Sequence, residues 1–86
     1  MKMKNKVLVK LYVPMIEEQY DVMLPLDKKI DDIINLLVKA VNEFSDGYYQ
    51  PKKRPILYDK ITAEPYNLSV KVKNSGIRNS TELILL

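Results

Sequence analysis

Acidic residues stand side by side at two places in the chain, as Glu17–Glu18 and Asp31–Asp32. Two carboxylates can act as general acid and base when they converge on one substrate. Neighbouring residues in a loop or on a helix point in different directions, so neither pair converges. The spacing also lacks the Asp-x-Asp-x-Asp-Gly pattern of a calcium loop. We therefore interpret these acids as solvated charges, with Asp31 and Asp32 favoured by the dipole at the start of a helix.

The hydroxyl residues have no partner that would activate them. The chain contains no histidine and no cysteine, which removes the commonest nucleophile–base pairs and nearly all zinc chemistry. No Ser-x-x-Lys motif and no glycine-rich phosphate loop is present. The sequence therefore predicts a protein that is not an enzyme and that uses neither a cofactor nor a metal ion.

Three consecutive cations, Lys52, Lys53 and Arg54, stand in a segment at residues 48–55 that also contains two tyrosines and two prolines. Such a loop can meet RNA, an anionic lipid or an acidic protein groove. Three cations are few, and no RNA-binding aromatic signature accompanies them. The net charge of +3 comes largely from lysines before residue 7. A solvated loop is the favoured interpretation, and a protein partner is favoured among the functional ones.

Alternating apolar residues predict strands at both ends of the chain. Residues 7–13 and 20–24 form a hairpin, residues 56–58 a short strand and residues 83–86 a last strand. In the first strand, one face carries Val7, Val9, Leu11 and Val13, and the opposite face carries Leu8 and Tyr12. In the short strand we expect Ile56 and Tyr58 to point inward and Leu57 outward.

One amphipathic helix is predicted between the hairpin and the later strands. Asp27 is the expected N-cap and Gly47 the expected stop, in a left-handed conformation. The apolar residues at helical spacing, all expected in the core, are Ile30, Ile33, Ile34, Leu37, Val38, Val41 and Phe44. One such stripe can cover one sheet face, which predicts a two-layer α+β domain. We expect the first and last strands to be parallel neighbours.

The 86 residues form one domain, 1–86, in which we expect residues 1–5 to be disordered. The segment Val72-Lys-Asn-Ser-Gly76-Ile77, before a polar bend at 79–81 and a closing strand, resembles the end of a ubiquitin-like domain. The resemblance extends over residues 6–86. It implies the β-grasp fold, a mixed sheet of four to five strands packed on one main α-helix. It also implies that Val72 and Ile77 are core residues and that Gly76 supplies an unusual backbone angle.

Among ubiquitin-like proteins the chain is most similar to the YukD/EsaB type, in residues 24–30, 33–37 and 76–86. That family accompanies the type VII (Esx, WXG-protein) secretion apparatus of Gram-positive bacteria. The resemblance implies an accessory or regulatory role and a protein partner, such as a membrane component of the apparatus. We expect a cytoplasmic protein, because no window approaches the roughly 20 apolar residues of a membrane helix. Because no Gly-Gly follows Leu86, we also expect no C-terminal conjugation.

The candidate docking residues are those expected on the outer face of the sheet together with the basic loop. They are Leu8, Leu57, Ile84, Leu86, Lys52, Lys53 and Arg54. Exposed apolar patches commonly mark partner sites, although single exposed aliphatic residues need no explanation. Three alternatives remain open: a sulfur carrier or modifier of the same fold, a small RNA-binding domain using the basic loop, and self-association through the apolar face.

Overall fold

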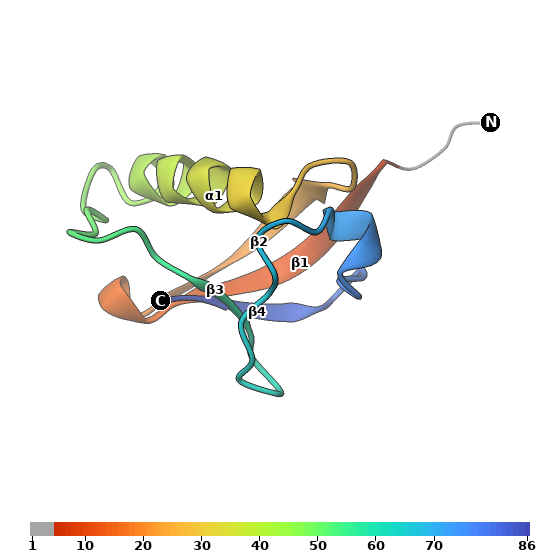
Figure 1. Ribbon diagram of the computed structural model, residues 1–86. Helices are drawn as coiled ribbons and strands as arrows, with labels where there is room; N and C mark the ends of the chain where they lie inside the picture. The colour runs from red at the N-terminus through yellow and green to blue at the C-terminus, as the bar shows by residue number, and fades with distance from the viewer. Residues whose placement is uncertain (1–4) are drawn as a thin grey trace.

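The computed structural model describes residues 5–86. Its four strands are β1 (Lys6–Val13), β2 (Glu18–Pro25), β3 (Leu57–Asp59) and β4 (Glu82–Leu85). They form one sheet in the order β2-β1-β4-β3. Helix α1 (Ile30–Phe44) lies across one face of this sheet, as Figure 1 shows, and two short 3-10 helices, η1 (Pro14–Ile16) and η2 (Val72–Asn74), lie in the connections. The predicted α+β architecture, a mixed sheet on one main helix, is confirmed.

The first strand lies at the centre of the sheet. β1 pairs antiparallel with β2 and parallel with β4, as expected for the first and last strands. The polar bend before β4 fixes this pairing: the Leu8 N–H donates to Asn79 Oδ1 at 2.9 Å, and the Ser80 N–H donates to the Leu8 carbonyl at 2.7 Å. Asn5 is joined to the sheet because its carbonyl accepts the Leu26 N–H at 2.9 Å. The expectation of disorder otherwise concerns residues 1–4, which lie outside the described residues.

The core forms between the inner face of the sheet and the apolar stripe of α1. Strand alternation is as expected in β1 and β4, where Leu11 and Leu83 are fully buried opposite each other. The predicted core positions Val72 and Ile77 are also buried. The complete set of buried side chains is Val7, Val9, Leu11, Val13, Leu24, Ile30, Ile33, Ile34, Leu37, Val41, Tyr49, Leu57, Val72, Ile77, Leu83 and Leu85.

The start of α1 corrects one expectation. Asp27 is not the N-cap; the helix begins after Lys29, which makes no side-chain capping bond. Backbone carbonyls of the later loop take that role, because Ile30 N–H donates to Val70 O at 2.9 Å and Asp31 N–H donates to Leu68 O at 3.1 Å. Asp27 instead pairs with Lys73 at 3.0 Å, and this hydrogen bond lowers the pKa of its carboxyl.

The end of α1 confirms one expectation and corrects another. Gly47 has the expected left-handed φ of +82° and donates its N–H to Asn42 O at 2.7 Å, although the left-handed turn that ends the helix begins one residue earlier, at Asp46 with φ +55°. Phe44, expected in the core, is 54% exposed. The reason is its place at the helix end, where the ring meets Tyr20 of the edge strand at a centroid distance of 5.2 Å.

Gly76 has φ +90°, and no atom lies within 4 Å of the place where a Cβ would stand. A residue with a side chain at this position is therefore strained by the left-handed backbone conformation and not by steric contact. We expect Gly76→Ala to lower the free energy of unfolding by about 1 kcal/mol, measured by urea denaturation. Gly76→Asn is the control, because asparagine tolerates the left-handed region better than alanine and should lose less. A larger loss for Asn would indicate steric crowding instead.

Candidate protein-docking surface

The third strand reverses the expected orientation of its side chains. Leu57 is buried, whereas Ile56 is 45% exposed, so Leu57 is wrong as a surface candidate. Pairing with β4 explains the reversal. Leu57 lies opposite the buried Leu85, and residues directly opposite each other in an antiparallel pair point to the same face. Tyr58, opposite Ile84, therefore points to the outer face as well.

An apolar surface, here called the outer patch, consists of Tyr12, Ile56, Tyr58, Ile84 and Leu86. These residues come from three neighbouring strands on the face of the sheet opposite α1. Ile84 lies beside Tyr12 on one side and Tyr58 on the other. Ile56 and Leu86 exchange backbone hydrogen bonds of 3.0 and 2.9 Å, which makes them cross-strand neighbours just beyond β3 and β4. The predicted outward direction of Ile84 and Leu86 is thus confirmed.

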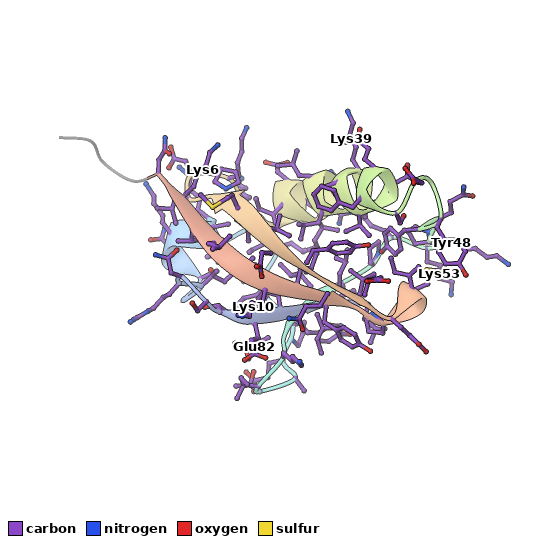
Figure 2. All side chains as sticks on the ribbon, turned by 180° about the vertical axis from the view of Figure 1, so that it is seen from behind. Lys6, Lys10, Lys39, Tyr48, Lys53 and Glu82 are labelled. Atoms are coloured by element: carbon purple, nitrogen blue, oxygen red, sulfur yellow. The ribbon has the colours of Figure 1, made fainter. Side chains whose placement is uncertain are left out.

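Leu8 is on the same face of the sheet but apart from the outer patch. Lys10 stands between Leu8 and Tyr12 on β1, with Asp21 and Glu82 as its neighbours on β2 and β4. Figure 2 shows Lys10 and Glu82 on the side of the sheet away from α1. This charged row separates Leu8 from the outer patch. Leu8 is grouped instead with Met23 and Asn79 around a hollow of about 450 Å³. The sequence therefore placed Leu8 on the correct face, but the structure does not join it to Ile84 and Leu86.

The basic loop is attached to α1 through one of its three cations. Arg54 Nη2 lies 2.8 Å from Asp31 Oδ1 and donates to the Asp31 carbonyl at 2.6 Å, and its Nε donates to Asn35 at 3.3 Å. Lys52 and Lys53 are exposed, and neither forms an ion pair within residues 5–86. Arg54 is therefore a positioning residue, and the two lysines remain for a partner.

Tyr49 anchors the other end of the same loop. Its side chain is 1% exposed, and burial raises the pKa of the phenol, so it stays neutral. Its backbone N–H donates to Ser45 Oγ and its carbonyl accepts the Asn42 amide, both at 2.9 Å.

Between this loop and the strand ends is a hollow of about 440 Å³, lined by Met15, Tyr49, residues 51–55, Ile56, Leu85 and Leu86. The hollow connects the two lysines to the outer patch.

Sequence reasoning missed Ile56 and Tyr58 in this surface. The signal that identifies them is the register between β3 and β4, which the sequence alone does not supply. The charges beside the patch are paired: Lys60 lies 3.5 Å from Glu82, and its Nζ is 5.5 Å from the centroid of the Tyr12 ring. Within residues 5–86 no group of three or more acids or other metal-binding side chains comes together. The arrangement offers exposed apolar contact area beside paired charges.

Solved structures of ubiquitin-like domains share this fold. The ubiquitin-like domain of EccD5 from Mycobacterium xenopi is 18% identical with a TM-score of 0.78, over 96% of this chain and 94% of that chain. The ubiquitin-like domain of the type VII secretion protein EccD1 from Mycobacterium tuberculosis is 13% identical with a TM-score of 0.74, over 94% and 97%. At identities this low, the structural similarity establishes the fold alone, which is the ubiquitin-like β-grasp.

A chain of the MycP5-free ESX-5 inner membrane complex is also similar, at 16% identity and a TM-score of 0.79. The match covers 96% of this chain but 21% of that chain, so this chain spans about a fifth of the larger protein. The sequence matches no protein-family model and shows no significant similarity to any curated protein. None of the helices in residues 5–86 has the length and apolar character needed to cross a membrane.

Proposed function

We propose that this domain is a non-catalytic protein-interaction module that serves a type VII-like secretion apparatus. It binds a protein component of that apparatus through the outer patch, with Lys52 and Lys53 placed to meet acids on the partner. The observation that carries the proposal is the exposed cross-strand pair Ile56–Leu86 beside the apolar hollow. Exposed, contiguous apolar groups of this kind commonly mark protein-docking sites.

The likeness to ubiquitin-like domains of type VII secretion proteins supports the choice of partner class. One similar chain belongs to an ESX-5 inner membrane complex. The basic loop is less suited to RNA than its sequence suggests, because Arg54 is held by Asp31 and Asn35. Two exposed lysines give a weak electrostatic footprint for a polyanion.

The test is an affinity capture with the wild-type domain and the double variant Ile56→Asp plus Leu86→Asp. We expect recovery of a secretion-apparatus protein to fall at least about tenfold, because two charges would be buried against the partner without compensation. The control is Leu68→Asp, since Leu68 is 44% exposed, close to the 45% of Ile56, but lies in the loop that contacts the start of α1. Undiminished capture by the double variant, with both variants folded, contradicts the proposal.

A further inference from the structure

One edge of the sheet is formed by β2, on the side of β1 away from β4 and β3, and β2 contributes no residue to the outer patch. β2 is the edge strand and pairs with β1 alone among residues 5–86. The Leu8 and Lys10 N–H groups donate to Asn79 and Thr81 on the β4 side. Residues opposite these two, Met23 and Asp21, therefore direct their own backbone groups away from β1. By the same alternation Gln19 does so too, which leaves an edge of three residues able to pair with another strand.

On the inner side of this edge β2 runs beneath α1 (Figure 2), and the hollow between Tyr20 and Phe44 is here called the groove. Tyr20 and Val22 point toward the helix but are only half-buried, because no further strand covers them. On α1, Leu36 and Phe44 are 47% and 54% exposed, and they share one side of the helix at intervals of four with Ala40 between them. Contact between Phe44 and Tyr20 places that side of α1 over β2.

The groove lies at the C-terminal end of α1. A hollow of about 310 Å³ is lined there by Ile16, Glu18, Tyr20, Phe44, Ser45 and Tyr48. Tyr48 is 77% exposed, so its ring face is open to a ligand. An extended chain added beside β2 would direct alternate side chains into this hollow and along the groove.

Charge around the edge determines what kind of chain fits. The segment from Glu17 to Pro25 contains three acids, Glu17, Glu18 and Asp21, and no lysine or arginine. The last turn of α1 has no basic residue either, so the negative end of the helix dipole faces the hollow without compensation. Pairing of β2 with β2 of a second copy would bring like charges together, which is destabilising. A segment that carries lysine or arginine is favoured instead.

We propose that the β2 edge binds an extended, lysine- or arginine-containing segment of a partner protein as a fifth strand. The segment forms backbone hydrogen bonds with Gln19, Asp21 and Met23. Its apolar side chains enter the groove between Tyr20 and Phe44, and its cations, on the opposite face of the added strand, meet Asp21. This site is separate from the outer patch, and it does not depend on the secretion role.

The probe is an acetylated, amidated heptapeptide in which Lys alternates with Val, Ile and Val. The ¹⁵N-labelled domain is titrated with it, and amide hydrogen exchange is measured at saturation. We expect saturable shifts below about 1 mM peptide and new protection of the amides of residues 19, 21 and 23. Residues 20 and 22, already bonded to β1, should keep their protection. The matched peptide with Glu in place of Lys should bind at least about tenfold more weakly.

Three variants sharpen the test. Asp21→Pro removes an outward N–H without touching the β1 pairing and should weaken binding at least about tenfold. Asp21→Asn keeps the N–H and removes the charge, for a loss of at most about fivefold. Phe44→Ser removes an exposed aromatic ring that lines the groove. This variant is used to test the proposal if the proline variant misfolds. Leu86→Asp, on the outer patch, should bind the peptide as wild type does.

Three results would overturn the proposal. The first is absence of saturable binding, or equal binding of the Lys and Glu peptides. The second is a set of shifts on the outer face of β1 and β4 in place of the β2 edge. The third is protection of residues 19, 21 and 23 without peptide, together with a molecular mass that doubles as the protein concentration rises. That result would identify a second copy as the occupant.

Discussion

Leu57→Ala is expected to lower the free energy of unfolding by about 3 kcal/mol, because the removed methyl groups leave a cavity between sheet and helix. Leu57 is 1% exposed and lies opposite Leu85, which is equally buried. A domain of this size is stable by about 4 to 13 kcal/mol, so the loss is a large part of the total. Urea denaturation at 25 °C, followed by circular dichroism, measures it.

The matched control is Leu86→Ala, the same chemical change one residue beyond the partner of Leu57. Leu86 is 64% exposed, and its truncation should alter the free energy of unfolding by less than about 0.5 kcal/mol. Equal effects of the two substitutions would mean that the register between β3 and β4 is not as described. A greater loss for Leu86 would mean the same and would restore Leu57 to the docking surface.

Asp59→Ala is expected to cost about 1.5 kcal/mol at pH 7, because Asp59 closes the turn after β3. Its Oδ1 accepts the N–H groups of Ile61 at 2.8 Å and Thr62 at 3.0 Å, and its Oδ2 accepts the Tyr66 hydroxyl at 3.1 Å. The Thr62 N–H is the largest cause of the lowered pKa of Asp59. Burial, and after it the Asp59 carboxylate, raises the pKa of Tyr66.

The sign of the pH dependence follows from the lowered pKa of Asp59. Its stabilisation is present above the unfolded pKa, near 4, and is lost as the pH falls through the lower folded value. Urea denaturation at pH 7 and at about pH 2.5 should therefore show the cost of Asp59→Ala shrinking in acid. Asp59→Asn, which retains one acceptor, should lose less and depend less on pH. A cost that does not change with pH would contradict the assigned bonds.

The sequence predicted those parts of the fold in which several residues repeat a pattern. The seven residues 7–13 fix which side of β1 is inward, and the stripe of α1 does the same for the helix. By contrast, Ile56, Leu57 and Tyr58 are three consecutive apolar residues, so they show no alternation that would indicate which of them point inward. Their orientation depends on pairing with β4, so Leu57 was assigned to the wrong face.

The remaining errors have the same long-range origin. Asp27 has the residue type of an N-cap, but loop carbonyls of Leu68 and Val70 reach the first N–H groups of α1 instead. Phe44 continues the helical period but stands where the sheet ends at its edge strand. The sequence placed Arg54 among three solvated cations. Its partners, Asp31 and Asn35, are about twenty residues earlier in the chain, so the local sequence did not indicate the contact. The sequence thus predicted the correct face for Leu8, Ile84 and Leu86 but not for Leu57, and it did not identify which residues lie together in the outer patch.

The parallel pairing of β1 with β4 also governs how fast the chain acquires its structure. The contact between Leu8 and Asn79 spans 71 residues, and closing a chain segment of that length costs about 4 kcal/mol of entropy. Contacts of such high contact order slow folding to milliseconds or longer. During synthesis on a ribosome, the hairpin and α1 emerge while one side of the central strand still lacks its neighbour. Until β4 emerges, the side of β1 that β4 covers in the finished sheet is therefore open to other proteins, in addition to the edge of β2.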